Sequence, residues 1–167
     1  VINPKQPLCR YPDERLAGAG LAFKLAHALL GDIPEELLPL AALGTIADVV
    51  PLIGENRAIA ALGLAHINEK RHIGIDALRQ VTGLGDRQVT AGHVGFVLGP
   101  RLNAGGRLDT ATPAVQLLTA ADREDALKLA KQLDAMNRER QQLVEEITRE
   151  AVRHVEAHAE KHRYAIV

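Results

Sequence analysis

The last quarter of the sequence, residues 122–163, contains no glycine and no proline. Apolar residues recur along it at steps of three and four or their multiples, the spacing of one helical face: Ala126, Leu129, Leu133, Met136, Leu143, Ile147, Ala151 and Val155. A continuous helix of this length spans on the order of 60 Å at about 1.5 Å per residue. That is longer than a compact domain of this size needs. The segment therefore predicts either a strut between two domains or a coiled-coil seam.

The preceding residues also have helical spacing, so the chain as covered is expected to be mainly α. We expect Asp13 to cap the first helix, Gly31 to end it, and Gly99-Pro100 to break the fifth. The start, "VINPKQP", resembles a strand end with its loop, and the end, "YAIV", a strand that has only begun. We therefore expect a segment of a longer protein. The expected helices before the long one are 13–31, 32–52, 55–69, 74–83, 90–102 and 112–119.

Composition excludes several classes of protein. The 167 residues are 47% hydrophobic, enough for a core, and carry a formal net charge of −1, so any anion site must be a local cluster. The single cysteine, Cys9, excludes an internal disulfide framework and suits a reducing cytoplasm. No apolar run approaches the roughly 20 residues that span a bilayer. We expect a cytoplasmic protein without a membrane segment.

Asp48 interrupts the apolar run "LGTIADVVPLI". We expect the run to be buried, and a buried ionised group is costly unless it is paired or holds a metal. Asp48 is therefore either a helix cap or partner of a base such as Arg57, or a ligand for a hard cation. Carboxylate oxygens suit Mg²⁺ or Mn²⁺, but one carboxylate cannot make a site alone.

A second stretch with potential chemistry is "GPRLNAGGRL", residues 99–108. The glycine pair at 105–106 predicts a tight turn, whose exposed backbone N–H groups can bind an anion. Arg101 and Arg107 flank that turn, and arginine suits bidentate contacts to phosphate. The side-chain amide of Asn103 lies between them. A surface loop with two solvated arginines explains the pattern equally well.

Taken together, "ALGTIADVVPLIGENR" and "GPRLNAGGRLDTA" resemble the later motifs of the RecJ exonucleases, members of the DHH phosphoesterase superfamily. The segment "VINPKQPLCRYPDERLAGAGLAFKLAHALL" resembles the part of that family which follows its Asp-His-His motif, and "LDAMNRERQQ" resembles its interdomain helix. The resemblance covers nearly the whole chain in order.

This resemblance implies a role in DNA recombination and repair. RecJ proteins degrade single-stranded DNA from the 5′ end with Mn²⁺ or Mg²⁺, by two-metal chemistry. Asp48 would be a metal ligand and catalytic residue, and Arg101 and Asn103 would lie near the substrate phosphate, Arg101 as a catalytic residue. The resemblance also implies that Arg107 lies at the substrate site, although its match to the motif of the family is weaker. DNA-repair proteins are possible partners, and the protein is expected to be a monomer.

The implied architecture is the C-terminal part of an α/β DHH domain (1–121), a connecting helix (122–163) and the start of a DHH-associated domain (164–167). The sequence contains no Asp-His-His and no Asp-x-Asp. The family's other metal ligands would precede Val1, and its second phosphate-binding motif would follow Val167. We therefore expect an incomplete active site and no activity from these residues alone.

Two other functions are compatible with the sequence. A DHH phosphoesterase that cuts short oligonucleotides or cyclic dinucleotides would carry the same motifs. A non-catalytic helical module could instead bind a protein partner through the apolar stripe of the long helix.

Overall fold

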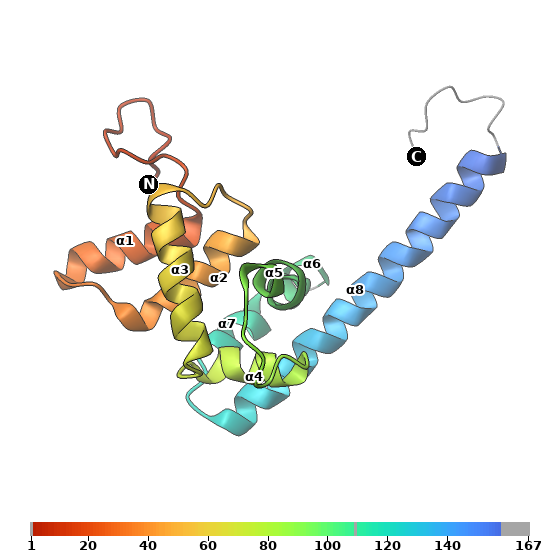
Figure 1. Ribbon diagram of the computed structural model, residues 1–167. Coiled ribbons are helices and arrows are strands. Elements are labelled where there is room, and N and C mark those ends of the chain that lie inside the picture. The colour runs from red at the N-terminus through yellow and green to blue at the C-terminus, as the bar shows by residue number, and fades with distance from the viewer. Residues whose placement is uncertain (1, 109, 158–167) are drawn as a thin grey trace.

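The computed structural model describes residues 2–108 and 110–157, with the side chains of 107 and 108 left out. In this part of the chain all regular elements are helices, which confirms the mainly-α expectation (Figure 1). In order they are α1 (Gly18–Leu30), η1 (Glu35–Leu37), α2 (Leu38–Ala47), α3 (Gly54–Asn68), α4 (Ile73–Val81), α5 (Ala91–His93), η2 (Val94–Leu98), α6 (Gly99–Leu108), α7 (Thr112–Leu118) and α8 (Arg123–Ala157).

The first helix ends where the sequence predicts but begins later. Gly31 ends α1 in a left-handed conformation with φ of 76°, which favours glycine. The expectation that Asp13 caps this helix is wrong, because α1 begins at Gly18 after Ala17. The Asp13 carboxylate instead accepts hydrogen bonds from the backbone N–H and the Nε of Arg15. Such a local bond holds the chain in a turn and competes with helix formation.

Two apolar clusters form the core. The smaller joins α1, α2 and α3, with Phe23 and Ile59 among its buried residues. The larger runs from α2 through α4, η2 and α7 into the first turns of α8, where Ala126, Ala130 and Leu133 are fully buried. The beginning of the long helix is therefore part of the packed body.

The long helix α8 is confirmed as far as Ala157, and the expected residues 158–163 lie outside the described part of the chain. Its first N–H groups bond to the Asp122 carboxylate, which accepts from Glu124 at 2.8 Å and from Asp125 at 3.0 Å. After packing on α4, α6 and α7, the helix leaves the body and projects away from it (Figure 1).

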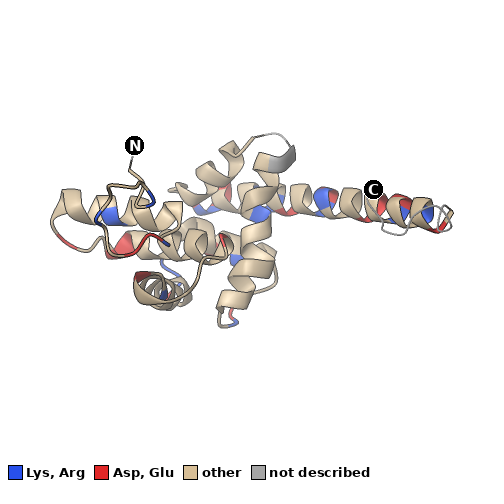
Figure 2. Cartoon of the chain, turned by 90° about the horizontal axis from the view of Figure 1, so that it is seen from above, with Lys and Arg blue, Asp and Glu red and all other residues tan. Residues whose placement is uncertain are grey.

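The projecting part of α8 carries acidic and basic side chains in mixed order, without a block of one sign (Figure 2). Its apolar residues Leu143, Val144, Ile147 and Val152 are about half exposed. Within the described residues, no helix has the length and apolar character needed to cross a membrane.

Candidate metal and phosphate site

Asp48 lies directly after the last residue of α2. Its backbone N–H donates to the Gly44 carbonyl at 3.0 Å, so the residue closes the helix. The side chain is exposed, and within the described part of the chain no hydrogen bond or ion pair engages its carboxylate, from Arg57 or any other residue. The expectation of a buried carboxylate is wrong, because the apolar helix ends one residue earlier and the chain turns outward.

The turn after Asp48 contains an unusual backbone conformation. Val49 has φ of 55° and is 87% exposed. A β-branched residue rarely adopts positive φ, and such strain costs on the order of 1–3 kcal/mol. Strained residues of this kind cluster at functional sites. The strained turn after α2 is therefore a candidate functional site.

The fold brings the segment that contains Asp48 next to the segment 99–108. Gly99, the first residue of the second motif, packs against the end of α2: a Cβ added to Gly99 would lie 3.1 Å from the Cβ of Ala47. Ala47 immediately precedes Asp48. The start of α6 is therefore in contact with the residue next to the candidate ligand, although about fifty residues separate them in the chain.

The second motif is helical, and both predictions about its backbone are wrong. Residues 91–108 form one continuous run of α5, η2 and α6, which Gly99-Pro100 does not break. The segment η2 is a π-helical turn, in which the Gly99 N–H donates to the Val94 carbonyl five residues earlier. Proline lacks an N–H and clashes with the preceding turn of a regular helix. Here Pro100 follows a turn whose hydrogen bonds are already irregular.

The glycine pair at 105–106 also lies within α6. The N–H groups of a helix interior bond to helix carbonyls, so they cannot form the expected anion-binding turn. Glycine is required at 105 for a different reason: an added Cβ would lie 2.6 Å from the Thr110 carbonyl oxygen. The glycine permits close packing of the following chain.

Arg101 is largely buried and fixed at two points. Its Nε donates to Asp134 Oδ1 of α8 at 2.8 Å, and its Nη1 donates to the Val97 carbonyl at 2.7 Å. The side chain is 18% exposed. Its Nη2 has no hydrogen-bond partner among the described residues. Sequence reasoning missed the contact with Asp134.

The other two predicted substrate residues are less constrained. Asn103 is exposed on α6, and its amide has no hydrogen bond among the described residues. The backbone of Arg107 is in α6, but its side chain lies outside the described part of the chain. Phe96 of η2 is 86% exposed, and its local sequence carries no signal of this exposure.

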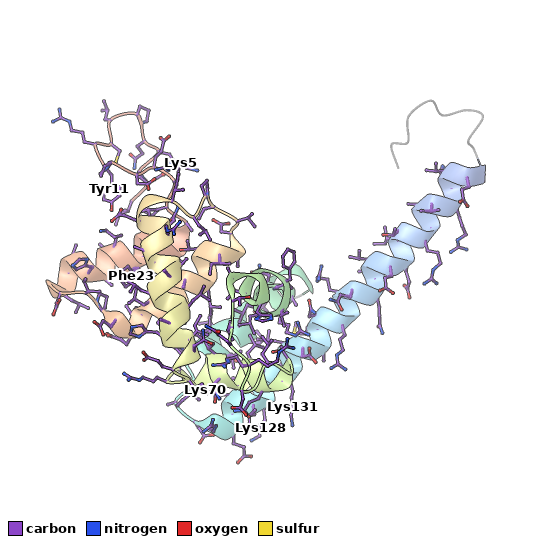
Figure 3. The ribbon with its side chains drawn as sticks, viewed as in Figure 1. Lys5, Tyr11, Phe23, Lys70, Lys128 and Lys131 are labelled. Carbon is purple, nitrogen blue, oxygen red and sulfur yellow. The ribbon has the colours of Figure 1, made fainter. Side chains whose placement is uncertain are left out.

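A separate polar network lies near the N-terminal segment. The Tyr11 hydroxyl donates to Glu55, which also accepts from the Lys24 Nζ at 2.6 Å. Desolvation favours the neutral carboxyl, but the hydrogen bonds from Lys24 and Tyr11 outweigh it and hold the pKa of Glu55 below its usual value. Figure 3 shows Tyr11 beside the loop that carries Lys5. A neighbouring pocket is lined by residues such as Leu8 and Tyr11, and none of the predicted site residues lines it.

The described residues do not form a metal site by themselves. They contain no group of three or more His, Cys, Asp or Glu side chains able to hold a metal ion together. Asp48 has a carboxylate of the kind that Mg²⁺ or Mn²⁺ prefers, and no other described residue bonds to it. At the C-terminal end of α2 this charge also lies near the negative end of the helix dipole, which a bound cation would relieve.

Comparison with known proteins confirms the resemblance to RecJ. The chain is 51% identical to the single-stranded-DNA-specific exonuclease RecJ of Bacillus subtilis over 156 residues, which is 93% of this chain and 20% of that protein. It is 41% identical to RecJ of Escherichia coli, over 91% of this chain and 29% of that one. No protein-family model matches the chain.

Solved structures agree with the sequence relatives. RecJ from Thermus thermophilus in complex with Mn²⁺ superposes with a TM-score of 0.75 at 38% identity, covering 87% of this chain and 22% of that one. An exonuclease RecJ bound to manganese gives a TM-score of 0.77 at 39% identity, covering 86% and 37%. The chain thus spans about a fifth to two fifths of the proteins that it matches.

Proposed function

We propose that this chain is part of a metal-dependent exonuclease that hydrolyses phosphodiester bonds of single-stranded DNA from the 5′ end, in recombination and repair. The observation that carries the proposal is the contact between Gly99 and Ala47. It joins a free carboxylate to a helix that carries Arg101 and Asn103, in a chain similar to RecJ over most of its length.

In this proposal Asp48 holds one divalent cation, Mn²⁺ or Mg²⁺, and is exposed enough to do so. Two such ions, when bound, supply activation of a water molecule and charge neutralisation at the attacking and leaving oxygens. Arg101 donates from Nη2 to a phosphoryl oxygen and stabilises the charge that grows there. The Asn103 amide and the Arg107 side chain bind the DNA backbone.

The proposed organisation keeps three parts: residues 1–121 as the end of a DHH catalytic domain, 122–163 as a connecting helix, and 164–167 as the start of a DHH-associated domain. The remaining metal ligands come from other parts of the native protein. We also propose a cytoplasmic monomer with DNA-repair proteins as possible partners.

The test is digestion of 5′-labelled single-stranded DNA by the native protein in Mn²⁺. Asp48→Ala should lower kcat by at least about 100-fold, because a lost ligand removes a metal that lowers the barrier by several kcal/mol. Glu36→Gln, which alters an exposed acid far from α6 in sequence, is the matched control and should keep full activity. Equal rates for Asp48→Ala and the native protein would rule out the ligand assignment.

Product sizes distinguish the neighbouring candidate. A DHH phosphoesterase for short oligonucleotides or cyclic dinucleotides would leave long single strands intact and cleave the short substrates. Progressive release of mononucleotides from a long strand supports the exonuclease.

The half-exposed apolar residues of the projecting α8 favour a second candidate, a helical module that binds a protein partner. Light scattering of the native protein over a range of concentrations distinguishes the two. A stable dimer that Ile147→Glu dissociates would support the module, and a monomer at all concentrations supports a connecting helix.

A further inference from the structure

Asp134 is a buried carboxylate on the long helix, and it accepts hydrogen bonds from two arginines. The residue is 5% exposed. Its Oδ1 accepts from Arg101 Nε at 2.8 Å, and its Oδ2 accepts from Arg138 Nη2 at 2.6 Å. Arg138 is on the same helix, one turn further along, and is mostly exposed. Asp134 thus links α8 to the candidate phosphate-binding helix α6.

The contacts of Asp134 restrict how Arg101 can move. An unrestrained arginine samples many rotamers, and binding a ligand would have to order it. Here Nε is held by Asp134 and Nη1 by the Val97 carbonyl, so the plane of the guanidinium is fixed. The nitrogen left without a partner among the described residues is Nη2.

The charge of the cluster also suits a phosphate. Arg101, Asp134 and Arg138 together bring two positive charges and one negative charge, so the pairing does not cancel the positive charge of the group. A phosphodiester near Nη2 would still be attracted by the surplus charge at short range.

We infer that Asp134 is a positioning residue: from the long helix it fixes the Arg101 guanidinium so that Nη2 can donate to the phosphodiester being cut. The inference rests on the proposed function of Arg101. It assigns to α8 a part in the reaction in addition to connecting domains. Misplacement of a positioned group by about 1 Å can cost on the order of 100-fold in rate.

The chain offers a matched control for this inference. Asp76 of α4 is also buried, and its Oδ2 accepts from Arg123 Nη2 of α8 at 2.6 Å. Like the pair of Asp134 with Arg101, this ion pair holds α8 against the helices of the body, but it involves a different arginine. Asp134→Asn and Asp76→Asn each remove the charge of a buried carboxylate that pairs with an arginine across the contact of α8 with the body, and only the first touches Arg101.

The experiment measures kcat and KM of the native protein on single-stranded DNA for Asp134→Asn, Asp76→Asn, Arg101→Ala and the two double variants that contain Arg101→Ala. Asp134→Asn should lower kcat at least tenfold with little change in KM, and Asp76→Asn should leave kcat within about twofold. If Asp134 acts through Arg101, the double variant with Asp134→Asn should be no slower than Arg101→Ala alone.

Four outcomes would overturn the inference. Equal losses for Asp134→Asn and Asp76→Asn would show that both only fasten α8. Additive losses in the Arg101→Ala/Asp134→Asn double variant would show that Asp134 acts independently of Arg101. Native activity in Arg101→Ala would refute the proposed role of Arg101 itself, and the inference with it, while activity lost in Arg101→Ala but kept in Asp134→Asn refutes the inference alone.

If Asp134→Asn does not fold, Arg101→Lys provides the test. Lysine keeps the positive charge but has no planar fork to bond Asp134 and the Val97 carbonyl at once. A tenfold or greater loss of kcat supports the inference. Activity within threefold of the native protein shows that a charge suffices without fixed orientation, and overturns it.

Discussion

Gly99 and Ala47 are in direct contact where α6 meets the end of α2, and Gly99 leaves no room for a side chain. An added Cβ would lie 2.9 Å from the Val94 carbonyl oxygen as well as 3.1 Å from the Ala47 Cβ. The close approach of α6 to the end of α2 therefore requires glycine at position 99.

We predict that Gly99→Ala lowers the free energy of unfolding by about 1–3 kcal/mol, the usual cost of overpacking. Gly95→Ala is the control, because an added Cβ there has no atom within 4 Å. That variant should be neutral or more stable by up to about 1 kcal/mol, since alanine favours helices. Urea denaturation measures both. Equal stability of the two variants would contradict the close contact.

The second prediction concerns these 167 residues produced alone. They should release no nucleotides from 5′-labelled single-stranded DNA in Mn²⁺, because the described residues supply one candidate ligand and no cluster of three. The same segment with Asp48→Ala controls for contaminating nuclease. Degradation by the first preparation and not by the second would refute the expectation of an incomplete site.

The third prediction is a pH dependence that arises from Glu55. Desolvation raises the pKa of this carboxyl in the folded state, but the hydrogen bonds from Lys24 and Tyr11 lower it by more, so the pKa lies below its usual value. The carboxylate therefore stabilises the fold above its unfolded pKa of about 4.5, and this contribution is lost as the pH falls through the lower folded pKa. Glu55→Gln should be less stable than the native protein at pH 7, with a difference that shrinks below pH about 4.5. Thermal unfolding from pH 7 to pH 3 measures it, and a constant difference would contradict it.

The fourth prediction concerns the strained turn beside Asp48. Asparagine adopts positive φ more readily than valine, and the Val49 side chain buries little surface. We expect Val49→Asn to raise the free energy of unfolding by about 0.5–2 kcal/mol. The same change at Val115, an exposed residue of α7, should alter it by no more than about 0.5 kcal/mol, because valine and asparagine have similar helix propensities. Destabilisation by Val49→Asn would show that the turn needs valine.

Local patterns predicted the helices well and the contacts poorly. The long helix was predictable because its segment lacks glycine and proline and keeps one apolar face. The burial expected for Asp48 is wrong because an apolar run does not reveal where its helix ends. The positive φ of Val49 has no sequence signal either. The ion pair of Arg101 with Asp134 joins residues 33 positions apart, and only the packing of α8 on α6 brings them together.

The π-helical turn at 94–98 gives the helical run 91–108 a place that can accommodate a change in length. It contains one residue more than a regular helical turn of about 3.6 residues would. Deleting a single residue from this turn would let 91–108 wind as a regular helix, because closing the wide turn compensates for most of the rotation that the lost residue supplied. A deletion of one residue should therefore be better tolerated here than in a regular helix.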